Sequence, residues 1–259
     1  MIILYKTLMK KIIKKIFFGK KAFQTFFRRL FDISIEGMNI GTGGRSINET
    51  GELFAIKYAL SKETNPTVFD VGAQGGDYVK EIFNITKGKA KIYAFEPCLR
   101  DYQILEKELG EKATIIKSAL GDTEGKATLY YPDNVGGLSS LHKPHNGFNE
   151  SEEVKIQTID NFCKLNNIKN ITLLKLDVEG NELACLKGAE HMLPTIKYIQ
   201  FEFSTASRDA RVYFRDIFNF LSDYKIYRIL RDGLYEIRNP EKITELLFTT
   251  NYLAERKNT

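Results

Sequence analysis

Short hydrophobic runs alternate with helical patterns between residues 67 and 203. Runs bounded by Gly, Pro, Asn or Asp predict strands at Thr67–Val71, Lys91–Phe95, Ala113–Ser118, Thr172–Asp177 and Lys197–Phe203. Apolar positions spaced by three and four predict helices between most of them, at Asp77–Phe83, Leu99–Leu109, Ile159–Leu165 and Glu182–Lys187. This alternation is typical of a doubly wound α/β fold, whose mostly parallel sheet is buried on both faces. Such sheets bind ligands beyond the carboxyl ends of their strands.

The chain divides into three parts on the same evidence. Residues 1–47 form a basic, amphipathic helical extension, and residues 48–240 hold the α/β domain, which opens with a helix over Asn48–Ser61. Residues 241–259 are expected to be a C-terminal helix or tail. A β-element at Lys126–Tyr131 leads into the loop Pro132–Glu150, which is long enough to be a lid or a substrate loop.

The N-terminal extension separates apolar from basic residues. Its apolar positions recur at spacings of three and four, with lysines on the other side; they are Tyr5, Leu8, Met9, Ile12, Ile13 and Ile16. No uncharged run approaches the roughly 20 residues of a membrane span, and lysine pairs interrupt any signal-peptide core. Two interpretations remain open. The helix lies in the plane of an anionic membrane surface, or it docks on its own core or on a second subunit.

Charge and cysteine usage narrow the class of protein. Residues 1–31 carry nine Lys/Arg and no acid, so the remainder holds 38 − 9 = 29 basic against 33 acidic residues, a net charge of −4. A body without a basic face argues against nucleic-acid binding. The three cysteines show no metal-ligand spacing, which fits a reducing cytoplasm. We therefore predict a cytoplasmic protein, which is peripheral at the inner membrane face if the N-terminal helix lies on a membrane.

The stretch VFDVGAQGGDYV, Val68–Val79, joins a buried strand to a glycine-containing turn. A dinucleotide fingerprint would have glycine where Gln74 stands, and a P-loop would continue with Gly-Lys-Ser/Thr. The turn therefore suits a ligand without a pyrophosphate. Asp70 can accept a hydrogen bond from an ammonium group, and Glu96 can accept both hydroxyls of a ribose. A cationic nucleoside with an amino-acid tail, such as S-adenosylmethionine, fits these acids.

Five segments then identify a resemblance. VFDVGAQGG, YAFEP, SALGD, QTID and LLKLDVEGNELACLKGA occur in the order and at the spacings of the FkbM-type S-adenosylmethionine-dependent methyltransferases. The similarity covers roughly residues 67–203, and LDVEGNE with the downstream KGA is its most specific part. The resemblance implies a Rossmann-like, class I methyltransferase sheet that methylates hydroxyl oxygens of sugars or natural products. Gln74 departs from the family's usual Asn, which leaves the detailed geometry of that contact open.

The resemblance also implies a set of cofactor-binding residues. The methionine end would lie against Asp70, Gly72, Ala73, Gln74 and Gly76, and the ribose against Glu96 and Pro97. Ser118 and Ala119 would border the adenine, Asp122 is a possible partner for its amino group, and Asp177 would touch the cofactor as well.

Carboxylates gather where the reacting methyl group should lie. Asp177, Glu179 and Glu182 follow the fourth strand, and Glu202 ends the fifth. Methyl transfer to a hydroxyl needs alignment and removal of a proton. Crowded carboxylates should raise at least one pKa, which suits a general base. Alternatively, they bind a divalent metal that polarises the hydroxyl. The structural alternative is that a glutamate here caps the next helix or pairs with a nearby lysine.

A second candidate base lies in the loop GGLSSLHKPH. It holds His142 and His145 beside Ser139 and Ser140, and a histidine near the methyl donor could take the proton. The predicted function is O-methyl transfer to a hydroxyl of a sugar in a glycan, glycolipid or natural product, and a homo-oligomer is one expected form of the enzyme. The alternatives are an NAD-dependent sugar oxidoreductase or epimerase, which would need the glycine that is missing at Gln74, and a non-catalytic, membrane-associated nucleoside-binding module.

Overall fold

A computed structural model describes residues 14–132, 138–143 and 148–257 of the chain. The chain forms two compact units, residues 1–41 and residues 42–259, and the division falls a few residues before the predicted one at 47. No helix in these described ranges is both long and apolar enough to span a bilayer.

The described part of the first unit is helical. A 3-10 turn, η1 (Lys21–Phe23), precedes α2 (Gln24–Gly37). Edge-to-face aromatic contacts join Phe18 to Phe27, with ring centroids 5.1 Å apart. The predicted amphipathic pattern falls mostly on residues outside the described ranges, and Ile16, its last member, is exposed.

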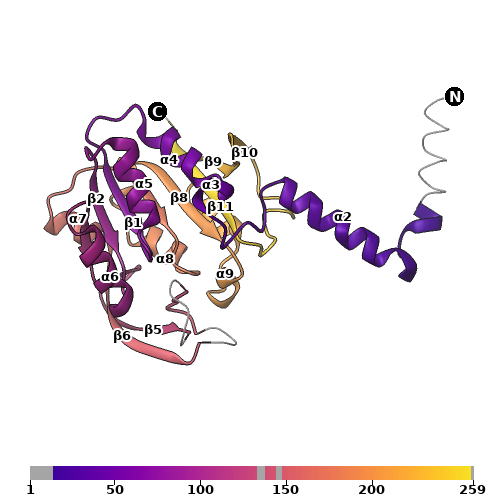
Figure 1. The fold of residues 1–259 in the computed structure, drawn as a ribbon, viewed down its shortest axis with the longest axis horizontal. Coiled ribbons are helices and arrows are strands. Elements are labelled where there is room, and N and C mark those ends of the chain that lie inside the picture. The colour runs from indigo at the N-terminus through magenta and orange to yellow at the C-terminus, as the bar shows by residue number, and fades with distance from the viewer. Residues whose placement is uncertain (1–13, 133–137, 144–147, 258–259) are drawn as a thin grey trace. The chain divides into compact units, whose positions relative to one another are not determined.

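An eight-stranded sheet forms the centre of the second unit, in the order β10-β9-β11-β8-β7-β1-β2-β3 (Figure 1). The five neighbouring strands β8, β7, β1, β2 and β3 pair in parallel. On the other side of β8, the strands β11, β9 and β10 add antiparallel pairs. Their bounds are β1 (Thr67–Val71), β2 (Lys91–Phe95), β3 (Thr114–Ile116), β7 (Ile171–Leu176), β8 (Ile196–Phe203), β9 (Tyr224–Ile229), β10 (Leu234–Ile237) and β11 (Thr250–Arg256). A second sheet holds β4 (Ala119–Leu120), β6 (Glu150–Gln157) and β5 (Gly125–Tyr131).

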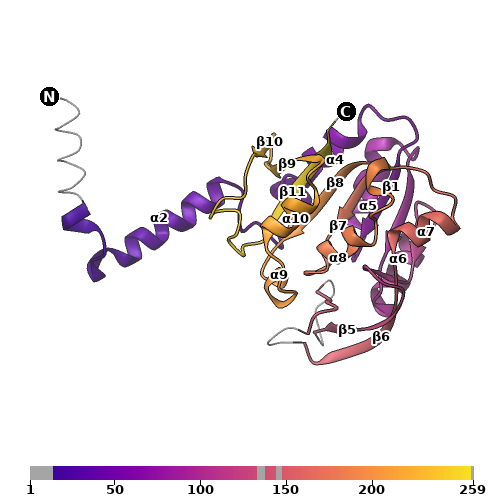
Figure 2. The ribbon, with the colours of Figure 1, turned by 180° about the vertical axis from the view of Figure 1, so that it is seen from behind.

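Helices cover both faces of the large sheet, as the two opposite views show (Figures 1 and 2). One face packs on α4 (Glu52–Leu60), α5 (Asp77–Thr86) and α6 (Leu99–Leu109), and the other on α7 (Ile159–Leu165), α8 (Glu182–Lys187) and α10 (Phe214–Phe220). Neighbouring residues of β1 point to opposite faces of the sheet. Val68 packs in the core cluster with α4, α5 and α6, and Phe69 in the core cluster with α7, α8 and α10. The doubly wound, mostly parallel fold predicted from the alternating pattern is confirmed.

The predicted helix over Asn48–Ser61 is two helices, α3 (Ile47–Thr50) and α4, separated at Gly51. Gly51 has φ of +85°, and a side chain there would lie 2.3 Å from the carbonyl oxygen of Leu230. The close approach of a distant strand end therefore interrupts a segment whose local apolar pattern is continuous.

Two strand predictions need correction. The predicted strand Ala113–Ser118 ends at Ile116, and the chain then leaves the large sheet for β4 in the small one. The C-terminal segment 241–259, expected as a helix or tail, contains β11, which inserts between β8 and β9 and is buried from Thr250 to Ala254. The prediction was wrong because the polar residues around β11 mask the strand pattern in the sequence. The strand is buried only because it pairs with β8 and β9, which are distant in the sequence.

Candidate functional site

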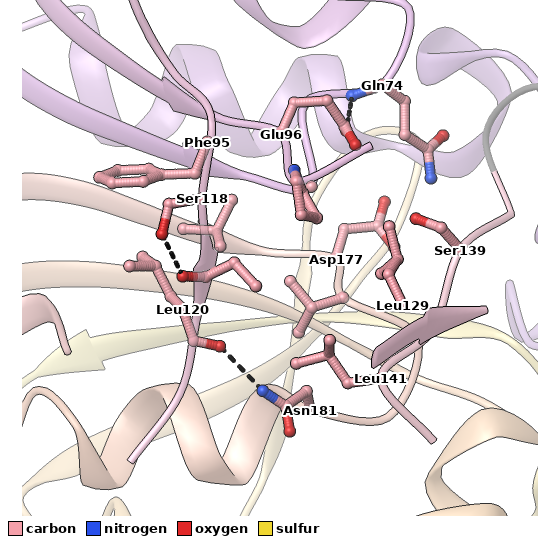
Figure 3. A pocket seen from close by; sticks show the side chains of 15 residues that line it. Gln74, Phe95, Glu96, Ser118, Leu120, Leu129, Ser139, Leu141, Asp177 and Asn181 are labelled. Carbon is pink, nitrogen blue, oxygen red and sulfur yellow. Dashed lines mark hydrogen bonds between the residues drawn. The ribbon is translucent and has the colours of Figure 1, made fainter. Parts of the chain in front are cut away.

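The functional site lies where β1 and β7 end side by side. At this point the chain order of the strands reverses direction across the sheet, which is where open α/β sheets bind ligands. A pocket opens here, and Figure 3 shows its walls. It is lined by Val71, Gly72, Gln74, Phe95, Glu96, Pro97, Ser118, Ala119, Leu120, Leu129, Ser139, Leu141, Asp177, Val178 and Asn181.

The glycine turn brings two strand ends into close contact. Gly72 has φ of +81°, and a Cβ there would lie 1.9 Å from the carbonyl oxygen of Asp177. Only glycine permits this approach. Gly76, at the start of α5, would instead place a Cβ 2.2 Å from a methyl group of Leu109 in α6. Gly72 thus shapes the pocket, whereas Gly76 serves helix packing.

Glu96 is the carboxylate at the end of β2. It is 1% exposed, and one of its oxygens accepts a hydrogen bond from the backbone N–H of Gln74 at 3.0 Å (Figure 3). The other oxygen accepts from the backbone N–H of Cys98 at 2.9 Å. Burial raises its pKa to about 7, although the two backbone donors act in the opposite direction. The backbone therefore fixes the direction in which this carboxylate faces the pocket.

Asp70 has a different position from the predicted one. It is fully buried and does not line the pocket, and its carboxylate lies 3.4 Å from the ammonium group of Lys175. Lys175 also lies 3.2 Å from Asp177 and therefore bridges the two acids. Burial by itself would lower the pKa of Lys175, but the neighbouring carboxylates outweigh burial and raise it, so the side chain is cationic.

The predicted carboxylates lie just after β7, as Asp177, Glu179 and Glu182, and near the carboxyl end of β8, as Glu202. Burial raises the pKa of Glu179 to about 7, and the charge of Asp177 adds to the shift. Glu202 has a pKa well above its ordinary value, first because of burial and then because of Asp177, Glu179 and Glu182. Crowding was expected to raise at least one pKa and does so, but burial is the larger cause.

Glu182 has a structural contact. Its carboxylate accepts hydrogen bonds from the backbone N–H groups of Val178 and Gly180, both at 3.2 Å. These bonds hold the turn between β7 and α8, in which Glu179 has the unusual φ of +49°. Burial raises the pKa of Glu182 to about 8. Glu182 is therefore the glutamate with a structural role, since its hydrogen bonds fix the turn that carries Asp177 and Glu179.

The loop after β5 closes one side of the site. The hydroxyl of Ser140 donates a hydrogen bond to the carbonyl oxygen of Glu179 at 2.8 Å, and the backbone of Ser140 pairs with Tyr130. Ser139 and Leu141, on either side, line the pocket. His142 does not line it; its backbone N–H donates to the Ser140 hydroxyl at 3.1 Å. His145 lies outside the described residues.

The pocket contains part of the predicted set. The predicted cofactor residues in its wall are Gly72, Gln74, Glu96, Pro97, Ser118, Ala119 and Asp177, and those outside it are Asp70, Ala73, Gly76 and Asp122. Residues that the sequence did not indicate are mainly apolar: Phe95, Leu120, Leu129, Leu141, Val178 and Asn181. An apolar residue in such a wall has the same sequence pattern as a core residue, so no signal separates them.

Asn181 joins the two sheets at the pocket. Its amide donates a hydrogen bond to the carbonyl oxygen of Leu120 at 2.8 Å (Figure 3). Among the residues that the structure describes, no group of three His, Cys, Asp or Glu side chains is arranged to hold a metal ion.

Known proteins were compared with the chain. The curated hexuronic acid methyltransferase AglP of Haloferax volcanii is 24% identical over 180 residues, which cover 68% of this chain and 70% of the relative. The structure of methyltransferase FkbM from Methylobacillus flagellatus aligns at 19% identity with a TM-score of 0.48, over 75% of this chain and 45% of that one. The plantazolicin methyltransferase BpumL in complex with SAH aligns at 14% identity with a TM-score of 0.45, over 96% of this chain and all of that one.

The family match covers both halves of the site. The methyltransferase FkbM domain matches residues 70–229, more than half of the 259-residue chain, and this range begins at the glycine turn and includes Glu96, the Asp177–Gly180 turn and Glu202. The chain therefore belongs to the FkbM methyltransferase family.

Proposed function

We propose that this protein transfers the methyl group of S-adenosylmethionine to a hydroxyl oxygen of a sugar. The observation that supports this most directly is the acidic pocket at the switch point of a methyltransferase-family sheet, formed around Glu96 and Asp177. A pocket whose described lining presents carboxylates and no basic side chain favours a cationic nucleoside over a phosphate-bearing one.

The residues present fit the cofactor. Glu96 is held by two backbone donors and retains lone pairs that can accept the ribose hydroxyls. Gly72 lets the strand end that carries Asp177 approach the turn closely, and Ser118 and Ala119 line the pocket where the base is expected. The free volume of the pocket is about 30 Å³, whereas ligand pockets usually hold about 300–1,000 Å³, so the proposal requires the pocket to widen on cofactor binding.

The carboxylates near the carboxyl ends of β7 and β8 are the groups that act on the acceptor hydroxyl. S-adenosylmethionine provides an electrophilic methyl group as its sulfonium, and the chain has to orient a hydroxyl and accept its proton. Glu179 has a pKa of about 7, close to that of an efficient general base near neutrality. Asp177 lines the pocket and is paired with Lys175, so we assign it to orienting the acceptor and Glu179 to taking the proton.

A sugar acceptor is supported by one relative and by the N-terminal unit. The curated relative AglP is a hexuronic acid methyltransferase, which supports a sugar as the class of acceptor. In the first unit, α2 carries Arg28 and Arg29 together with exposed Phe26, Leu30 and Ile33. Aromatic and basic side chains on one helix suit a membrane interface. We propose peripheral contact with an anionic membrane through residues 1–31, where lipid-linked sugars could be presented.

The decisive experiment has two parts. Isothermal titration calorimetry should show binding of S-adenosylmethionine and none of NAD; the reverse result would refute the proposal. Transfer of tritiated methyl groups should then be measured against cell-envelope glycans and lipid-linked sugars. Cofactor binding without transfer to any acceptor tested would favour the non-catalytic nucleoside-binding alternative.

A further inference from the structure

A second hollow lies beside α9 (Ala206–Asp209), the short helix that follows β8 (Figure 1). It has a volume of about 440 Å³, within the usual range of ligand pockets. Its polar walls are Arg208, Arg211, Tyr213, Arg215 and Glu245. We call it the arginine cavity. Three arginines against one carboxylate give its walls a formal charge of 3 − 1 = +2.

The acid in the cavity is already bound. The two oxygens of Glu245 accept hydrogen bonds from the backbone N–H groups of Phe214, at 3.0 Å, and Arg215, at 3.1 Å. Asp216, next to the cavity, likewise accepts from the N–H of Tyr213 at 2.9 Å. These carboxylates are engaged with backbone donors at the start of α10, and in the described ranges neither forms a salt bridge with an arginine of the cavity.

The arginines differ in how far they are engaged. Arg208 forms an ion pair with the adjacent Asp209 at 3.3 Å through Nε, which leaves its two terminal nitrogens. Arg215 lies over the ring of Tyr213, with 4.9 Å between the guanidinium carbon and the ring centroid. Neither Arg211 nor Arg215 forms a salt bridge with any residue in the described ranges. Two guanidinium groups therefore remain available to an anion from solution.

The cavity adjoins the catalytic turn. A Cβ at Gly180 would lie 2.6 Å from the carbonyl oxygen of Ala206 and 3.4 Å from the Cβ of Ala210. The helix that carries Arg208 is thus in backbone contact with the turn that carries Asp177 and Glu179. A molecule held by the arginines would extend toward the carboxylates.

We propose that the arginine cavity binds an oxyanion of the acceptor, the carboxylate of an acidic sugar or the phosphate of a phosphorylated one. That the bound anion belongs to a methyl acceptor rests on the proposed function, whereas the anion site itself is tested by binding alone. Guanidinium groups bind both oxyanions through paired, charge-assisted hydrogen bonds. The acidic turn next to the cavity repels the same group, so the anion is held at the arginines and a hydroxyl is left at the carboxylates.

The test uses the full chain and three small probes, glucuronate, glucose 1-phosphate and glucose, titrated by ligand-observed NMR at low salt. Both anions should bind more tightly than glucose, and the tighter of the two identifies the source of the oxyanion. The double variant Arg211→Gln/Arg215→Gln should weaken anion binding about tenfold or more and leave glucose unchanged. A matched control, Lys197→Gln/Lys225→Gln, removes two charges at the starts of β8 and β9, the opposite ends of those strands from α9.

The outcomes separate the two proposals. Anion binding that equals glucose binding, or that survives in the double arginine variant, overturns the anion site. Anion binding lost equally in the lysine control shows a general charge effect and overturns it as well. Failure of S-adenosylmethionine to bind refutes the proposed function while the anion result stands. With an active acceptor, the double variant should raise KM for the anionic acceptor and leave kcat and the affinity for S-adenosylmethionine unchanged.

Discussion

The two hollows of the catalytic unit differ in charge, in volume and in the kind of side chain that forms them. The pocket at β1 and β7 encloses about 30 Å³ behind short or buried side chains fixed by the backbone, such as Glu96. The arginine cavity holds about 440 Å³ behind long, exposed guanidinium groups. The segment Asp177–Asn181 lines the pocket, and its Gly180 packs against α9, the helix that carries Arg208 of the cavity.

The difference has a physical reason. Bonds to backbone donors fix the direction of a side chain, which suits a ligand that is the same in every reaction cycle. Long arginines on the surface adapt to a charged group without fixing the rest of the molecule. We infer that the pocket serves the cofactor and the cavity serves the acceptor. The predictions below test this division.

The largest effect is expected at the turn after β7, which carries Asp177 and Glu179. Asp177→Asn and Glu179→Gln should each lower turnover about 10²- to 10⁴-fold, since both remove a carboxylate that acts on the acceptor hydroxyl. Steady-state kinetics with the active acceptor measures the loss, and circular dichroism checks that the fold persists. Unchanged turnover in both variants would move the base elsewhere, and His142→Ala is then the variant to test. A chelator that leaves activity intact would favour the general base over a metal ion.

Replacement of Glu96 should act on the cofactor alone. Glu96→Ala removes the carboxylate that faces the pocket and should weaken S-adenosylmethionine binding by about 1.5–3 kcal/mol. It also leaves the N–H groups of Gln74 and Cys98 without their acceptor. Glu96→Gln, which keeps an acceptor for one of them, is the milder comparison. Calorimetry measures both, and a loss of acceptor affinity with normal cofactor affinity would contradict the division between the hollows.

Turnover should depend on pH through the raised pKa of Glu179. Its folded-state value of about 7 lies above the ordinary 4.5, so the folded protein keeps this proton until the pH approaches 7. A base must be deprotonated to act, so turnover should rise about tenfold per pH unit below 7 and level off above it. The Glu179→Gln variant should lack this inflection. A profile that falls as the pH rises through 7 would exclude the carboxylate as the base.

Removal of the first unit should have the smallest effect on either hollow. A chain that begins at Thr42 keeps the whole second unit and should retain its affinity for S-adenosylmethionine. The full chain should bind anionic vesicles, with about 1 kcal/mol from each lysine near the surface and weaker binding at high salt, and the shortened chain should not. Aggregation or a changed oligomeric state of the shortened chain would instead show that the helix is a packing element.

Local patterns were sufficient for much of the fold. The predicted bounds of β1, β2, α6, α7 and α8 match those of the structure, because a buried run or an amphipathic face is recorded in consecutive residues. The family resemblance, together with the expectation that ligands bind beyond the carboxyl ends of parallel strands, assigned Gly72, Glu96 and Asp177 to one site, and all three line the pocket.

Contacts between distant segments decided the rest. The carbonyl of Leu230 breaks the helix at Gly51, and β11 becomes a buried strand only between β8 and β9. Asp70, read as a ligand to an ammonium group, pairs with the ammonium of Lys175 inside the protein. Glu245 reaches the start of α10 from thirty residues further along the chain and helps to form the arginine cavity. A sequence determines which residues prefer burial and where turns occur; the partners of a buried charge, and the distance between two backbones, are set only when the chain is packed.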